Sequence, residues 1–208
     1  FSVFRSYNLA VWPFQVFLYL MAITVIYLGA RRWRLGDRII FSILAFFWIW
    51  MGVAYHLMHF TKVNNAAWVF GIAFIIQGLL FLYEGFFHRQ ISIKYQENIY
   101  GITGTIFIFY ALMVYPLAGF WIGHQFPDAP GFGLPCPTTI FTFGILLWSD
   151  RRPGIIMLAI PLVWSVIGFM AAIAFGMYED IFLLFAGLLT LLLLVILPKK
   201  PNGIGQAK

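Results

Sequence analysis

The stretch Leu9–Ala30 reads LAVWPFQVFLYLMAITVIYLGA, carries no charged residue and is followed by Arg31, Arg32, Arg34 and Arg38. A helix of about 20 apolar residues crosses a bilayer core of about 30 Å. Clustered arginines directly after such a stretch are typical of the cytoplasmic end of a span. The pattern therefore predicts a first transmembrane helix over residues 9–30.

The same pattern recurs along the whole chain. We expect further spans over residues 39–60, 66–87, 99–122, 135–149, 154–175 and 180–197. The composition agrees, because 62% of the 208 residues are hydrophobic and only 10% are charged, whereas a soluble domain carries about 25% charged residues. The prediction is an all-α, polytopic transmembrane bundle of about seven spans that forms a single membrane domain over residues 1–208, with the lipid bilayer as its solvent.

The basic residues predict the orientation of this bundle. Eleven of the thirteen Lys and Arg residues fall on one side of the predicted spans, and only Arg5 and Lys62 fall on the other. Because basic loops stay in the cytoplasm, we expect the C-terminus inside and the N-terminus outside. The net charge of +6 forms no basic face for a phosphate backbone, so nucleic acid is not an expected partner. The chain begins at Phe1 rather than Met, and we expect some residues to precede it.

The fifth predicted span is unusually short. Even when it is counted from Pro135 to Ser149, its helix would rise only about 22 Å, less than the bilayer core. The preceding run is rich in Gly and Pro, and irregular backbone at membrane depth is tolerated only when protein or a cavity surrounds it. We expect either a short helix or a re-entrant loop here, and an ordinary loop before a helix is an equally weighted alternative.

With this topology, several chemically capable residues gather at the predicted outer face. The candidates for an outward-facing polar pocket are His56, His59, His124, Cys136, Thr138, Thr139, Glu179 and Asp180. His56, His124 and Cys136 are the candidate ligands if a metal is bound. Each residue also has a structural interpretation, since histidines often lie at the interface, acids cap helices and a lone cysteine packs as a small apolar residue. Apart from Asp180, the first residue of the last predicted span, the only acid inside a predicted span is Glu84, near the cytoplasmic end and close to His88 and Arg89.

Several stretches also resemble a known family. They are FGLPCPTTIFTFG at 132–144, NLAVWPFQ at 8–15, WMGVAYH at 50–56, QGLLFLY at 77–83, PLVWSVIG at 161–168 and FGMYED at 175–180. These strings resemble a bacterial family of domains of unknown function, number 6064, over nearly the whole chain. The resemblance implies the bacterial cytoplasmic (inner) membrane, and it implies no activity or cofactor.

Three functional classes remain open. The first is a non-catalytic accessory or structural subunit that packs against other membrane protein subunits, which short loops, 8 Trp, 24 Phe and the glycine pairs Gly101/Gly104 and Gly119/Gly123 favour. The second is a transporter or receptor for a small solute or metal ion that uses the outward pocket. The third is a membrane-embedded metal or haem protein. No Walker, GxGxxG, CxxCH or HExxH motif is present, so an enzyme is not favoured.

Overall fold

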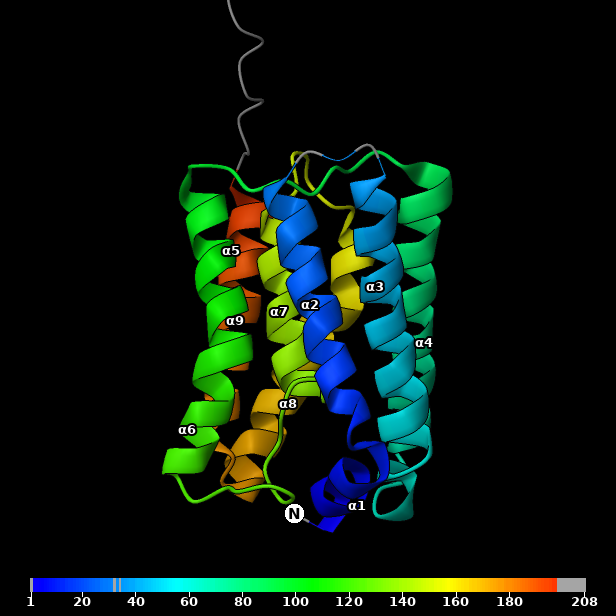
Figure 1. Cartoon of the computed structure of the whole chain (residues 1–208), viewed down its shortest axis with the longest axis vertical. Coiled ribbons are helices and arrows are strands. Elements are labelled where there is room, and N and C mark those ends of the chain that lie inside the picture. The colour runs from blue at the N-terminus through cyan, green and yellow to red at the C-terminus, as the bar shows by residue number, and fades with distance from the viewer. Residues whose placement is uncertain (1, 32, 34, 198–208) are drawn as a thin grey trace, which may run out of the picture.

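The computed structural model describes residues 2–31, 33 and 35–197, and within them every regular element is helical. The longer helices are α1 (Ser2–Val11), α2 (Phe14–Ala30), α3 (Gly36–Trp50), α4 (Ala67–Tyr83), α5 (Ile99–Phe109), α6 (Tyr115–Trp121), α7 (Pro135–Leu147), α8 (Ile155–Phe175) and α9 (Ile181–Leu191). Short 3₁₀ or π-helical turns are η1 (Met51–Leu57), η2 (Phe60–Lys62), η3 (Glu84–His88), η4 (Tyr110–Val114), η5 (Tyr178–Asp180) and η6 (Leu192–Ile196). The helices stand side by side as one bundle (Figure 1), and the predicted all-α membrane class is confirmed.

Five of the described helical stretches are long and apolar enough to cross a membrane, namely 36–62, 67–88, 99–121, 155–175 and 178–196. A sixth is reached if α1 and α2 are counted together, although they bend by 81°. Helix α7 is apolar but shorter. The number of spans near seven and their orientation stay predictions.

The first predicted span differs from the structure. Residues 9–30 do not form one straight helix, because the chain turns between Val11 and Phe14 and α1 lies across the end of the bundle (Figure 1). Pro13 has no N–H and its ring clashes with the preceding helical turn, so a sharp bend there is expected. We call this end of the bundle the α1 end.

Helix α7 is the centre of the bundle. All of its residues except Cys136 are buried, and α5, α8 and α9 pack around it. The loop before it, residues 122–134, runs from the end of α6 along the α1 end and then rises to the start of α7 (Figure 1). Phe132 and Leu134 of this loop are 1% exposed. The fifth predicted segment is thus a short helix of 13 residues. The irregular chain that leads into it is buried in the protein, as irregular backbone at membrane depth has to be.

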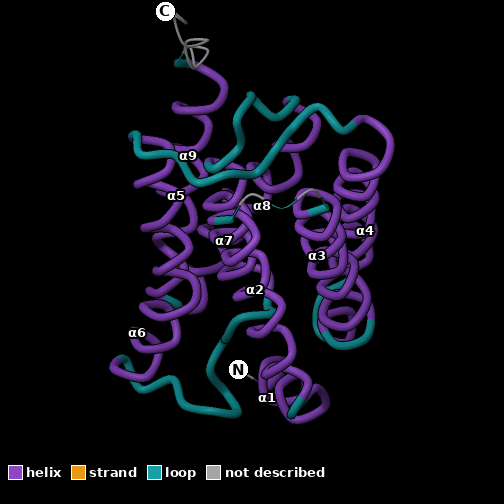
Figure 2. Tube along the Cα trace, turned by 45° about the horizontal axis from the view of Figure 1, so that its top comes forward, coloured by secondary structure: helices purple, strands orange, loops and turns teal. Residues whose placement is uncertain are grey.

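At the opposite end, residues 89–98 cross from α4 to α5 as a strap (Figure 2). The strap is tied to three helices by its own backbone: Tyr95 N–H donates to Gly29 O at 2.9 Å, Lys94 N–H donates to Trp148 O at 2.9 Å, and Ile93 N–H donates to Asp37 Oδ1 at 2.8 Å. The first two bonds satisfy carbonyls that the ends of α2 and α7 leave unpaired. We call this the strap end.

Glu84 fixes the start of the strap. Its Oε1 accepts the N–H of Gln90 at 2.8 Å and of Ile91 at 3.0 Å, while Oε2 lies 2.6 Å from His88 Nδ1. The side chain is 3% exposed, so Glu84 is paired rather than extended to the interface.

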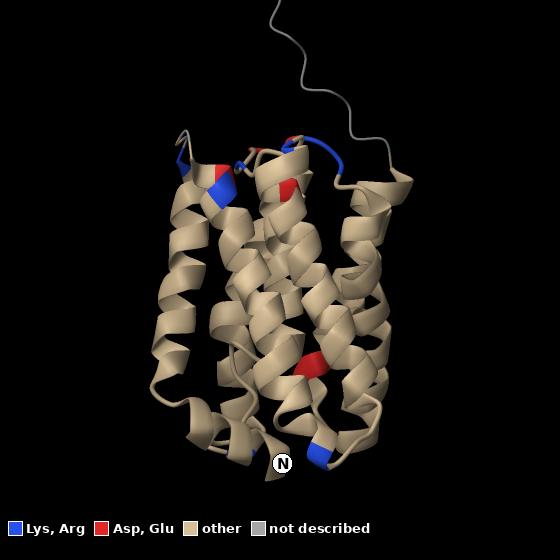
Figure 3. Ribbon diagram, turned by 90° about the vertical axis from the view of Figure 1, so that its right-hand side faces the viewer, with Lys and Arg blue, Asp and Glu red and all other residues tan. Residues whose placement is uncertain are grey.

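The charges lie mainly at the two ends of the bundle (Figure 3). The strap end carries the described basic residues Arg31, Arg38, Arg89, Lys94, Arg151 and Arg152, whereas Arg5 and Lys62 belong to the α1 end. Arg32, Arg34, Lys199, Lys200 and Lys208, which also entered the predicted charge bias, lie outside the described residues.

Candidate functional site

Two adjacent carboxyl groups lie buried near the α1 end. Helix α8 ends at Phe175 and is capped by Gly176, whose φ of 69° suits a glycine, and the chain then turns through η5 into α9. This turn places Glu179 at 2% and Asp180 at 6% exposure. Ionisable residues inside a membrane bundle are expensive, and they are functional candidates by default.

Glu179 is held by two other elements. Its Oε1 lies 2.8 Å from His124 Nδ1, just after α6, and its backbone carbonyl accepts a hydrogen bond from the Tyr110 hydroxyl at 2.9 Å. The second carboxylate oxygen, Oε2, is buried without a hydrogen-bond partner within the described part of the chain. Glu179 Oε2 is therefore available to accept a hydrogen bond or to contact a bound cation.

Asp180 is held by neutral donors. The Tyr115 hydroxyl donates to Asp180 Oδ1, and the Cys136 thiol at the start of α7 donates to the same carboxyl group. His124, Glu179, Asp180, Tyr115 and Cys136 thus come from four separate segments, and we call them the acidic site.

Gly119 of α6 leaves room beside this site. A Cβ at Gly119 would stand 3.6 Å from Glu179 Oε1 and 3.8 Å from His124 Cβ, which are ordinary contact distances. The space next to the carboxylate therefore accommodates a group about as large as a methyl.

His56 reaches the acidic site only through an aromatic neighbour. Its ring is 0% exposed, and both ring nitrogens lack a hydrogen-bond partner among the residues that the structure describes. The imidazole packs against Phe74 at 4.7 Å and Trp164 at 5.2 Å between ring centroids. Trp164 in turn lies beside Cys136, since a Cβ on Gly168 would stand 3.6 Å from Trp164 Nε1 and 3.5 Å from Cys136 Sγ.

The remaining predicted pocket residues use their polar atoms locally. Thr138 Oγ1 accepts from Gly133 N–H at 3.1 Å, and Thr139 Oγ1 donates to Pro135 O at 2.7 Å. His59 Nδ1 donates to Ala54 O at 2.6 Å. These three side chains stabilise the start of α7 and the end of η1, and their hydroxyl and imidazole groups are not directed to the carboxyl groups.

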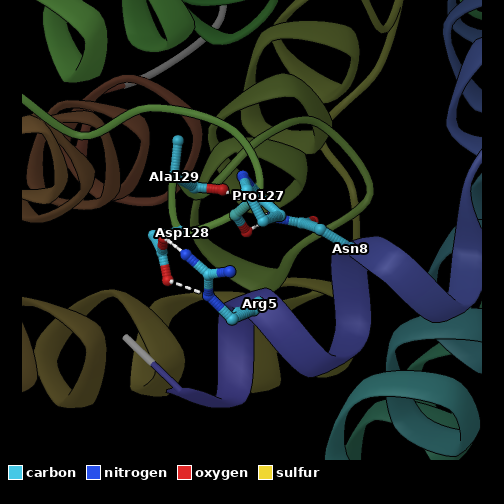
Figure 4. A network of polar contacts seen from close by, with 5 residues as sticks. All are labelled: Arg5, Asn8, Pro127, Asp128 and Ala129. Carbon is cyan, nitrogen blue, oxygen red and sulfur yellow. Dashed lines mark hydrogen bonds and ion pairs between the residues drawn. The ribbon is translucent and has the colours of Figure 1, made fainter.

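The structure also shows a latch that the sequence pattern did not predict. Asn8, 1% exposed, donates through Nδ2 to Pro127 O at 2.7 Å and to Ala129 O at 2.8 Å, and Arg5 pairs with Asp128 between them, with Nε 3.0 Å from Oδ1 (Figure 4). The Tyr7 hydroxyl donates to Gly133 O at 3.0 Å. Helix α1 therefore holds, through these bonds, the loop that leads into α7 and the acidic site.

The ion pair of the latch changes the pKa of its carboxyl group. The Arg5 guanidinium hydrogen-bonds the Asp128 carboxylate and lowers the pKa of that carboxyl below its usual 3.8. Tyr110, Tyr115 and this latch are the functional residues that sequence reasoning missed. The signal for the latch was the position of Arg5, one of only two basic residues on its side.

A metal centre finds little support in this arrangement. Among residues 2–31, 33 and 35–197, no group of three or more His, Cys, Asp and Glu side chains could hold a metal ion. His56, His124 and Cys136 do not gather into a ligand set, because His56 is surrounded by aromatic rings and His124 pairs with Glu179.

Comparisons with known proteins identify the family and nothing more specific. No curated protein and no solved structure matches the chain. A family described as of unknown function, DUF6064, matches residues 1–202, so nearly the whole chain is covered and the resemblance read from the sequence strings is confirmed. The protein belongs to the DUF6064 family of unknown function.

Proposed function

We propose that this membrane protein binds a small solute with a single positive charge at the acidic site, as a receptor or carrier for it. The observation that carries the proposal is the charge balance of the site. It has two buried carboxyl groups and one imidazole, and no Lys or Arg forms an ion pair with Glu179 or Asp180 in the described residues. A buried carboxylate without a cationic partner is costly, and a bound cation would supply the missing charge.

The surroundings favour a monovalent ion or a protonated amine. The acidic site offers the unpartnered Glu179 Oε2, the Tyr115 hydroxyl and the room beside Gly119, and the Tyr110 hydroxyl lies next to it. Aromatic rings stand close by, with Tyr110 stacked on Phe182 at 3.9 Å between centroids, and ring faces attract cations. A transition metal would need more ligands of the kind that do not gather here.

Two arguments for the accessory-subunit prediction are weakened by the contacts within the chain. It assumed that Glu84 is the only acid within the spans, yet Glu179 and Asp180 are also buried. It also assigned Gly101 and Gly104 to contacts with partner subunits, whereas Gly104 packs within the chain against Gly144, and Gly101 packs against the backbone of Gln96. An accessory role stays a prediction, as does an inner-membrane location.

The test measures thermal unfolding of the purified full chain in detergent with NaCl, KCl or methylammonium chloride, each balanced against N-methyl-D-glucamine chloride. A ligand that binds only the folded state stabilises it by about 2.7 kcal/mol when its concentration is about 100 times Kd. We expect one of the three cations to raise the unfolding midpoint of the wild type. Asp180→Asn should abolish this rise, because it removes the charge and retains the size of the side chain.

Two further variants sharpen the result. Glu84→Gln removes a buried carboxylate at the other end of the bundle and should keep the cation response. Gly119→Ala places a methyl group 3.6 Å from Glu179 Oε1 and should weaken the response without unfolding the protein. The proposal fails if no cation stabilises the wild type, or if Asp180→Asn and Glu84→Gln respond alike. Stable co-purification with other membrane subunits, together with no cation response, would favour the accessory role instead.

A further inference from the structure

A second polar feature lies at the strap end, away from the acidic site. It is a half-open pocket of about 410 Å³ between the end of α2, the start of α3 and the strap. Ligand pockets range from about 300 to 1,000 Å³, so this one is large enough for a small polar group. Among its lining residues are Arg31, Trp33, Asp37, Ser92, Lys94 and Asp150.

The lining combines two cations with two carboxylates. Asp37 Oδ1 accepts the N–H of Ile93 at 2.8 Å, and Asp150 Oδ1 accepts the N–H of Ser92 at 2.9 Å. These bonds hold both carboxylates in the wall through the strap backbone. Among the described residues, neither Arg31 nor Lys94 forms an ion pair with them. Within the described part of the chain, opposite charges therefore share one pocket without forming an ion pair with each other.

The position of the pocket suggests what could occupy it. It lies where α2 ends and α3 begins, which is the level of lipid headgroups if the bundle spans the bilayer. Trp33 in its wall is 59% exposed, and tryptophan is enriched at this level of membrane proteins. Basic pockets between transmembrane helices bind lipid headgroups in other membrane proteins, and this pocket adds two carboxylates to its two basic residues.

We propose that this pocket binds a phosphoethanolamine group, the headgroup of a zwitterionic aminophospholipid. Arg31 and Lys94 match the phosphate, and Asp37 and Asp150 match the primary ammonium. A purely anionic headgroup would meet repulsion from both carboxylates. A choline headgroup has a positive charge but no N–H to donate to them. This inference does not depend on the proposed cation site.

Native mass spectrometry of the purified full chain tests the assignment. The probes are phosphatidylethanolamine, phosphatidylglycerol and phosphatidylcholine with the same acyl chains, and free O-phosphoethanolamine as a competitor. We expect phosphatidylethanolamine to bind about tenfold more tightly than the other two lipids, because only it can make charge-assisted hydrogen bonds at both ends. Competition by the free compound at equal concentration would indicate a soluble source of the headgroup, and competition only by lipid would indicate the membrane.

Variants separate the two halves of the pocket. Arg31→Gln with Lys94→Gln should weaken binding of all three lipids. Asp37→Asn with Asp150→Asn keeps a side-chain carbonyl to accept the strap N–H groups, and should reduce phosphatidylethanolamine binding only to the level of phosphatidylcholine. Lys62→Gln at the α1 end is the matched control and should change nothing. Tighter binding of phosphatidylglycerol than of phosphatidylethanolamine, or equal lipid binding by wild type and folded variants, would overturn the proposal.

Discussion

At the scale of single residues, Asn8 and Arg5 show two ways of holding the same loop. Asn8 is buried and its amide bonds two carbonyl groups of the loop, so its contribution does not depend on pH or salt. Arg5 and Asp128 are exposed on the surface, where water and salt screen an ion pair. The latch therefore has a permanent part and a part that acid can weaken.

The Arg5–Asp128 pair predicts a pH dependence of defined sign. Because the pKa of Asp128 in the folded protein lies below its usual 3.8, the pair stabilises the latch fully above that value and loses its effect as the pH falls through the lowered pKa. Amide hydrogen exchange of residues 122–134, corrected for intrinsic rates, should be slower in wild type than in Asp128→Asn at about pH 6, and the difference should shrink as the pH is lowered below 3.8. A difference that stays constant over this range would refute the assignment.

The same scale shows how far single residues could be predicted. Glu179, Asp180, His124 and Cys136 were chosen because one topology places them at one end, and the structure brings their side chains into contact. Thr138 and Thr139 share that end, but their hydroxyls bond the adjacent backbone, as short hydroxyl side chains at helix starts often do. Tyr110 and Tyr115 were missed because a tyrosine in an apolar span has no distinctive sequence pattern, and only the fold shows that their hydroxyls bond Glu179 O and Asp180 Oδ1.

At the scale of elements, glycine crossings determine how closely α5 and α7 approach. A Cβ on Gly144 would stand 2.7 Å from Gly104 O, and one on Gly104 would stand 2.5 Å from Gly144 O. Two backbones in such close contact need residues without side chains. The sequence showed small residues at Gly101 and Gly104, but spacing alone does not reveal whether their partner lies in the same chain or in another.

Gly144→Ala should therefore destabilise the bundle. Its methyl group would press on backbone, which has no rotamer to move aside, and overpacking of this kind costs about 1–3 kcal/mol. Gly154→Ala is the matched control, because nothing lies within 4 Å of a Cβ there. Thermal unfolding in detergent should show a lower midpoint for Gly144→Ala only. Equal midpoints for the two variants would mean that α5 and α7 do not cross at these glycines.

Elements also explain why the bend within the first predicted span was not foreseen. Hydrophobicity runs without a break through Pro13, so residues 9–30 looked like one segment of suitable length. Pro13 allows the bend, but the position of α1 across the end of the bundle is held by Asn8, Tyr7 and Arg5, whose partners lie more than a hundred residues later in the chain. A local pattern contains no information about such partners, whereas the apolar length of α4 and α8 was sufficient to place those helices.

At the scale of the whole molecule, the two ends of the bundle differ in charge and in chemistry. Among the described residues, the strap end carries six basic residues and the pocket proposed for a lipid headgroup, and the α1 end carries two basic residues and the acidic site. If basic residues stay in the cytoplasm, the acidic site takes its solute from outside the cell. The orientation thus decides whether the solute of the proposed cation site comes from outside or from inside the cell.

Labelling of single cysteines in intact cells tests that orientation. In a Cys136→Ala background, Lys62→Cys at η2 should react with a membrane-impermeant thiol reagent, because it lies at the α1 end. Arg151→Cys, which follows Asp150 beside the strap, should react only after the membrane is permeabilised. Arg34 and Lys199 would serve the same purpose on the basic side of the sequence, although they lie outside the described residues. The reverse labelling pattern would place the acidic site in the cytoplasm, and a cation bound there would then have to come from within the cell.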